Sequence, residues 1–151
     1  MIAAILRVLL FVALGPLAAA FAGNLAIAFL MNAGVIATEP GVGPGEVFAG
    51  FLTAENLVQA YRVGFIPSLA TGIVALLLAR AMTDWQNWLA VAFGGASISA
   101  ALAWFLFVAS PIGEGANPFL LAGVSGFAGG AGALICAAAY DGLAGLLRRR
   151  S

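Results

Sequence analysis

Few side chains in this chain of 151 residues could carry out chemistry, and those lack the partners that chemistry needs. Ser97, Ser99 and Ser125 offer hydroxyl groups, but the sequence contains no histidine and no lysine. Because a serine nucleophile needs a base within hydrogen-bonding reach, these residues do not predict a hydrolase. Histidine is also the commonest metal ligand and the usual proton shuttle near neutral pH. We therefore expect no enzyme activity, no catalytic residues, no metal site and no cofactor.

The remaining candidates for chemistry are Cys136 and the glycine run 129–132. Cys136 is the sole cysteine, so an intramolecular disulfide is excluded, and its apolar neighbours Leu134 and Ile135 are typical of an unreactive thiol. The run Gly-Gly-Ala-Gly could suggest a phosphate-binding loop. It contains no lysine and follows no predicted strand, however, so we reject that interpretation.

Composition identifies an integral membrane protein. Hydrophobic residues make up 64% of the chain and charged residues 8%, against about 25% charged in soluble domains. The mean hydropathy is +1.11. Residues 1–151 fit one integral-membrane domain, and a net charge of zero gives no support for nucleic-acid binding. The first apolar run is too long for the core of a signal peptide, so we do not expect it to be cleaved.

Apolar segments predict an all-α, polytopic fold: a four-helix transmembrane bundle. The expected spans cover about 8–31, 62–80, 88–109 and 119–140, each near the length of about 20 residues that crosses a bilayer. Residues 32–61 form the longest connection. Glycine and proline predict an irregular stretch up to Gly50, and Thr53 predicts the N-cap of a short periplasmic amphipathic helix before the second span.

Small residues recur at spacings of four in the predicted spans, which is typical of closely packed membrane helices. The predicted helix-packing residues are Gly15, Ala19 and Gly23 in the first span, Gly95 and Ser99 in the third, and Ala122, Gly126 and Gly130 in the fourth. The fourth span has two such rows, so we expect it to be the centre of packing. Packing within the chain and packing on a partner both remain open.

Polar side chains inside the spans predict contacts between helices. These residues are Asn24, Ser68, Thr71 and Ser97. Alternatively, the same four residues and Ser99 could line a pathway for a solute. Hydroxyls that follow Pro67 can also bond carbonyls that the proline leaves free. No ionisable residue lies in the middle of a predicted span, which argues against a proton-coupled exporter of the small four-helix multidrug type. The signature residues of fluoride channels are also missing.

Arginine placement predicts the orientation. With both termini in the cytoplasm, Arg7, Arg80 and the arginines at 148–150 lie inside, whereas Arg62 lies outside. We therefore expect a multi-pass protein of a bacterial inner membrane with cytoplasmic N- and C-termini.

The connection and surface helix combine charge with apolar side chains, which is unusual for an idle linker. We expect Phe48 and Phe51 to act as apolar anchors and Arg62 to pair with Glu55 or Glu114. This segment either docks on a partner or covers the ends of its own bundle, and the sequence leaves both possibilities open.

Three motifs carry a resemblance to a known group: Leu14-Gly15-Pro16, the segment 61–72 (Tyr-Arg-Val-Gly-Phe-Ile-Pro-Ser-Leu-Ala-Thr-Gly) and Arg80. With these motifs the chain resembles small uncharacterised four-helix inner-membrane proteins of proteobacteria. The resemblance implies topology and compartment and assigns no catalytic residues. Our functional expectation is a non-enzymatic structural or accessory subunit, in contact with the lipid bilayer and with another membrane protein or a second copy of itself. The alternative is a small permease or channel for an uncharged or weakly polar solute.

Overall fold

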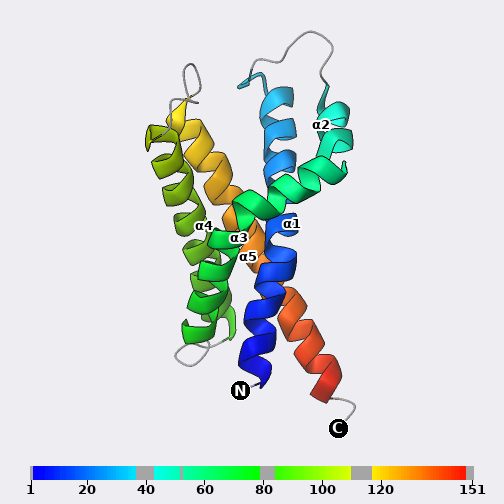
Figure 1. Cartoon of the computed structure of the whole chain (residues 1–151), viewed down its shortest axis with the longest axis vertical. Helices are drawn as coiled ribbons and strands as arrows, with labels where there is room; N and C mark the ends of the chain where they lie inside the picture. The colour runs from blue at the N-terminus through cyan, green and yellow to red at the C-terminus, as the bar shows by residue number, and fades with distance from the viewer. Residues whose placement is uncertain (1, 37–42, 52, 79–83, 110–116, 149–151) are drawn as a thin grey trace.

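A computed structural model describes residues 2–36, 43–51, 53–78, 84–109 and 117–148. These residues form five α-helices (Figure 1): α1 (Ile2–Asn32), α2 (Pro44–Phe51), α3 (Ala54–Leu78), α4 (Asp84–Ala109) and α5 (Pro118–Arg148). Four of them, α1, α3, α4 and α5, are long and apolar enough to cross a membrane. At about 1.5 Å per residue, each exceeds the thickness of about 30 Å of the hydrocarbon core. The chain is therefore an all-helical, multi-pass membrane protein.

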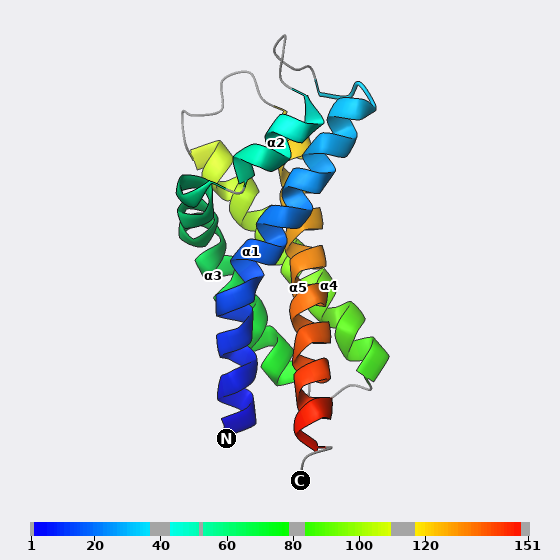
Figure 2. The same cartoon turned by 90° about the vertical axis from the view of Figure 1, so that its right-hand side faces the viewer.

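The bundle has two distinct ends, and both termini lie at one of them (Figure 1). We call this the terminal end and the opposite one the loop end. Helix α5 packs extensively on both α4 and α1, and α3 packs on α1 and, less extensively, on α4. In the view of Figure 1, α1 and α5 cross near the middle of the molecule, and Figure 2 shows the first half of α3 beside α1.

Local sequence signals explain where three of the helices begin or end. Thr53 caps α3, since its Oγ1 accepts a hydrogen bond from the Asn56 backbone N–H at 3.4 Å. Asn117 caps α5 by accepting from the Phe119 backbone N–H at 3.0 Å, and Pro118 occupies the first helical position, where no intrahelical donor is needed. At the end of α1, Gly34 has a φ of 70°, which allows the Val35 N–H to reach the Leu30 carbonyl at 2.9 Å.

The short helix before the second span differs from the prediction. The structure has no separate surface helix at 53–61: these residues are the first turns of α3, which continues without a break to Leu78. The additional helix is α2, within the stretch expected to be irregular. Pro44 accounts for this, because proline is compatible with the first turn of a helix, and the glycines after it weaken a short helix without preventing it.

Helix α5 is also longer than predicted. The predicted span ends near residue 140, yet the helix runs on through Gly142 and Gly145 to Arg148. Neither glycine has a neighbouring atom within 4 Å of the position that a Cβ would occupy. Leucine and alanine fill much of the segment, and their helix propensity outweighs the cost of about 1 kcal/mol for each glycine.

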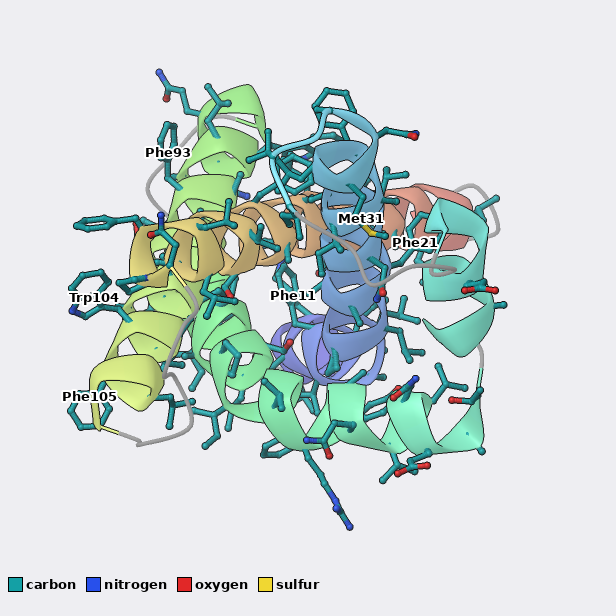
Figure 3. All side chains as sticks on the ribbon, turned by 90° about the horizontal axis from the view of Figure 1, so that it is seen from above. Phe11, Phe21, Met31, Phe93, Trp104 and Phe105 are labelled. Carbon is teal, nitrogen blue, oxygen red and sulfur yellow. The ribbon has the colours of Figure 1, made fainter. Side chains whose placement is uncertain are left out.

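The interior is small and the outer surface is apolar, as expected in lipid. Phe11, Val91 and Cys136 are 1%, 1% and 0% exposed and lie in the cluster that joins the four long helices. Seen from above, Phe11 points between the helices, whereas Phe93, Trp104 and Phe105 lie on the outer side of α4 (Figure 3). Apolar side chains therefore occur all around the spans, and small residues rather than hydrophobicity mark the inner faces.

Candidate sites in the membrane-embedded helices

The closest approach in the molecule lies between α4 and α5. A Cβ at Gly95 would be 2.7 Å from the carbonyl oxygen of Gly129, and one at Gly129 would overlap the Ser99 hydroxyl. One turn away, the corresponding position at Gly126 lies 3.3 Å from the Cβ of Ala100. At Gly130 it lies 3.2 Å from the Ala92 carbonyl oxygen. Gly126 and Gly130 belong to one small-residue row of α5 and Gly129 to the other, which continues at Ala133 and Ala137, so both rows face α4.

Helix α1 meets α5 and α3 through its own small residues. Gly132 of α5 packs on the Ala19 backbone, with 2.9 Å from its Cβ position to the Ala19 nitrogen. Gly23 faces Ala128 of α5 at 3.4 Å. Gly15 turns instead toward Ser68 of α3, so the row 15, 19 and 23 contacts two helices. Ala122, the remaining predicted packing residue, is half-buried on α5.

Three of the predicted polar residues meet at the centre of the bundle. Ser68 and Thr71 of α3 and Ser99 of α4 line a cavity of about 30 Å³ together with small residues of α1 and α5. The Thr71 hydroxyl donates to the Pro67 carbonyl at 2.7 Å. Pro67 has no backbone N–H, so the carbonyl that lacks its helical hydrogen bond is that of Val63, four residues earlier. The Thr71 hydroxyl bonds the carbonyl of Pro67 instead, so it does not replace the missing hydrogen bond. The cavity has room for roughly one or two water molecules.

The other two predicted polar residues lie elsewhere. Ser97 is exposed on α4 and does not line the central cavity. Asn24 is half-buried, and its Nδ2 donates to the Ala20 carbonyl at 2.8 Å on its own helix. Asn24 therefore does not bridge two helices through a hydrogen bond. The five residues that could have lined one pathway are thus divided among three places.

A polar cluster that the sequence analysis missed joins all four spans near the terminal end. Arg7 of α1 is 8% exposed, and its Nη1 donates to the Ala75 carbonyl of α3 at 3.2 Å. Its Nη2 lies 4.0 Å from the Asp141 carboxylate of α5, and its guanidinium lies over the Tyr140 ring at 4.5 Å. Trp88 of α4 donates from Nε1 to the same carboxylate at 2.7 Å.

We call this group the Arg7 cluster; it consists of Arg7, Ala75, Trp88, Tyr140 and Asp141. Its contacts compensate for most of the cost of burying the Arg7 guanidinium. The cation–π contact and the carboxylate both favour the cation. The sequence contained a signal for it, because Arg7, Trp88 and Asp141 all fall at the same predicted interface. Two side-chain atoms in the described part of the chain remain buried without a hydrogen-bond partner, Arg7 Nε and Asn87 Oδ1.

Tyr61 links α3 to the proline turn of α1. Its hydroxyl donates to the carbonyl of Ala13, which lies one turn before Pro16. Pro16 is fully buried, and Gly64 of α3 packs on its ring, with 2.9 Å between the two Cβ positions. The bond and the packing together hold the first half of α3 across α1.

The predicted docking residues lie on α2 and α3. The side chains of Phe48 and Phe51 are outside the described residues, as is Glu114. Glu55 and Arg62 are both exposed on α3. The ion pair seen among the described residues joins Arg7 to Asp141, and Arg62 does not pair with Glu55.

Two larger hollows open toward the loop end. One is an apolar groove of about 700 Å³ between α1 and α5, lined among others by Leu25, Phe29, Phe119, Gly123 and Phe127. We call it the α1–α5 groove. At its rim the Phe119 ring packs on Trp104 of α4, with 5.2 Å between the ring centroids. The other hollow is a polar cleft of about 440 Å³ between α1, α2 and α3.

The described residues offer little for catalysis. They include no group of three or more histidine, cysteine, aspartate or glutamate side chains that could hold a metal ion. Cys136 is fully buried in the core. Comparisons of the chain with protein-family models, curated proteins and solved structures gave no match. Inference about function therefore rests on the hollows and surfaces of the molecule.

Proposed function

We propose that this protein is a non-enzymatic accessory subunit that binds a transmembrane helix of another membrane protein in the α1–α5 groove. The groove carries the proposal. Its volume of about 700 Å³ is that of a large small-molecule pocket, for which the range is about 300–1,000 Å³, so side chains of a neighbouring helix can enter it. Its lining is apolar, so it suits an occupant that is itself inside the bilayer.

The exposure of the groove's aromatic side chains supports a protein partner. Phe29 of α1 and Phe119 of α5 are 71% and 75% exposed. The same two helices pack closely further along, where Gly132 meets Ala19. Gly123 has no neighbouring atom within 4 Å and leaves the floor of the groove open. An open glycine next to large aromatic side chains offers the close backbone approach that membrane helices use when they associate.

The limited burial of the spans within the chain is also consistent with a protein partner in the membrane. In the most apolar window of each span, between 11% and 33% of the residues are buried by the chain itself. The lowest fraction belongs to α4, and the highest to α1. Most of the helical surface is thus free to contact lipid or a partner.

The permease alternative has weaker support. Ser68, Thr71 and Ser99 do converge, but the space between them is about 30 Å³. A pathway would need Asn24 and Ser97 to join them, and these residues lie elsewhere. In this conformation the centre of the bundle therefore fits a packed core better than a conduit.

For compartment and orientation we propose a bacterial inner membrane with both termini in the cytoplasm. Arg7 belongs to the first turns of α1, which begins at the terminal end, and α5 ends there with Arg148, which Arg149 and Arg150 follow in sequence. Arg62 belongs to the first half of α3, which begins toward the loop end. Arginine in short loops is enriched on the cytoplasmic side. The loop end, with α2 and the start of α3, then faces the periplasm.

Photo-cross-linking in native membranes tests the proposed docking. A benzophenone amino acid replaces Phe119 inside the groove or, as a matched control, Phe93, which is 72% exposed on the outer side of α4. We expect a discrete protein adduct from position 119 and lipid adducts from position 93. A second variant, Gly123→Leu, places a large side chain in the groove at a position where the added Cβ meets no atom within 4 Å, and it should abolish the protein adduct.

Two outcomes would contradict this function. Lipid adducts alone at both positions would show that the groove is an ordinary lipid-facing surface. A protein adduct that persists in Gly123→Leu would place the partner outside the groove.

A further inference from the structure

The polar cleft between α1, α2 and α3 lies apart from the α1–α5 groove and uses different residues of α1. Its polar lining consists of Asn24 from α1, Glu46 from α2, and Asn56 and Gln59 from α3, and Ala20 and Val63 supply apolar surface. Figure 1 shows α2 beside α1 above the first half of α3, so three elements surround the cleft. A cleft of about 440 Å³ has the size of a small-molecule site.

The hydrogen bonds within the cleft decide which polar groups remain for a ligand. Asn24 Nδ2 donates to the Ala20 carbonyl at 2.8 Å, and Asn56 Nδ2 donates to the Gly50 carbonyl at 2.7 Å. Because a carbonyl can only accept, these bonds fix each amide with its nitrogen toward the backbone, and neither amide oxygen has a hydrogen-bond partner among the described residues. The free groups of both asparagines are therefore acceptors.

Glu46 adds a negative charge to these acceptors. It is exposed and forms no ion pair with any described residue. It lies in the first turn of α2, where a carboxylate is favoured by the positive end of the helix dipole. Among the described residues that line the cleft there is no arginine, so none of them supplies a cation that competes for the carboxylate. The cleft thus presents hydrogen-bond acceptors and one negative charge.

These features select a ligand that is cationic and rich in donors. A primary ammonium group carries one positive charge and three N–H donors, which matches a carboxylate together with amide oxygens. A hard metal ion fits less well, because Ca²⁺ takes about 6–8 oxygen ligands. The apolar side chains of Ala20 and Val63 suit the methylene groups that accompany an organic amine.

The depth of the cleft relates it to the membrane interface. Asn24 lies eight residues before the end of α1, which corresponds to about 12 Å along the helix from its loop end. A ligand in the cleft would thus lie at the level where lipid headgroups meet the hydrocarbon core. We propose that this cleft binds a primary ammonium group, held by the Glu46 carboxylate and the asparagine side-chain oxygens. The group could arrive on an aminophospholipid or on a soluble amine.

Lipid binding to the full-length purified protein tests the proposal. Native mass spectrometry measures the binding of phosphatidylethanolamine and of phosphatidylcholine with the same acyl chains. The second lipid keeps the positive charge but has no N–H donors. We expect phosphatidylethanolamine to bind about tenfold more tightly, as hydrogen bonds to charged groups allow. Competition by soluble ethanolamine would identify the free amine as sufficient, and its absence would identify the lipid as the source.

Two variants tie the binding to the cleft. Glu46→Gln should remove the preference between the lipids, whereas Glu55→Gln, at an exposed carboxylate outside the lining, should leave it unchanged. Gln59→Glu adds a second carboxylate and should tighten binding of phosphatidylethanolamine, a gain that loss of folding cannot imitate. Equal binding of both lipids together with no binding of ethanolamine, or an unchanged preference in Glu46→Gln, would overturn the proposal.

Discussion

The crossing of α4 and α5 makes a quantitative prediction about Gly129. A methyl group added there would overlap the Ser99 hydroxyl and would lie 2.5 Å from the Gly95 carbonyl oxygen. The serine side chain could rotate, but the carbonyl belongs to the helix backbone and cannot move without its helix. Gly129→Ala must therefore push α4 and α5 apart along their closest contact.

The expected magnitude follows from comparison with Gly123→Ala on the same helix. Alanine in place of glycine stabilises a helix by about 0.5–1 kcal/mol, and this contribution is common to both variants. Gly123 has no neighbouring atom within 4 Å, so Gly123→Ala introduces no overlap. Overpacking costs about 1–3 kcal/mol, and the fixed carbonyl argues for the upper part of that range. We expect Gly129→Ala to be less stable than Gly123→Ala by about 2–3 kcal/mol.

Reversible unfolding in mixed micelles measures this difference. The denaturing detergent is titrated, and far-UV circular dichroism follows the loss of helix. The double variant Ser99→Gly/Gly129→Ala should recover part of the loss, because it removes the side-chain overlap and leaves the carbonyl in place. Equal free energies of unfolding for Gly129→Ala and Gly123→Ala would refute the close approach of the two helices.

Three further predictions concern the rest of the molecule. Trp88→Phe removes the indole donor to Asp141 and should lower the free energy of unfolding by about 1 kcal/mol in the same assay. An unchanged free energy of unfolding would contradict this hydrogen bond. Cys136 is 0% exposed and should resist N-ethylmaleimide until the protein is denatured, unlike a cysteine in Glu55→Cys, and fast native labelling would contradict its burial. In intact bacterial spheroplasts, an impermeant maleimide should modify Glu55→Cys and reach Ser151→Cys only after permeabilisation; labelling of both would contradict the four-span topology, and the reverse pattern would overturn the proposed orientation.

Hydropathy and length were sufficient to predict four membrane-spanning helices, because the bilayer requires long apolar segments whatever their packing. The ends of the helices were less predictable. Glycine and proline in α2 and in the last turns of α5 indicated irregular structure, yet both segments are helical. These residues weaken a helix by a small amount, and neighbouring residues can outweigh them.

The partners of individual side chains could not be derived from spacing. The two small-residue rows of α5 were visible in the sequence, but both face α4, since residues three and four apart form one broad surface. Nothing in the sequence distinguishes Ala28 from a lipid-facing alanine of the first span, but in the structure it is buried, with 6% of its surface exposed. Arg7 and Asp141 are 134 positions apart, and it is the tertiary fold that brings their side chains together.

The place of α5 between α1 and α4 has a consequence for how the protein is made. Helices α1 and α4 share little direct contact, and α5, the last of the four spans along the chain, packs extensively on both. Until α5 enters the bilayer, Gly23 of α1 and Gly95 of α4 lack the α5 residues on which they pack. The first three spans then form an open intermediate that membrane chaperones or quality-control proteases could recognise. Closure of the bundle therefore waits for α5.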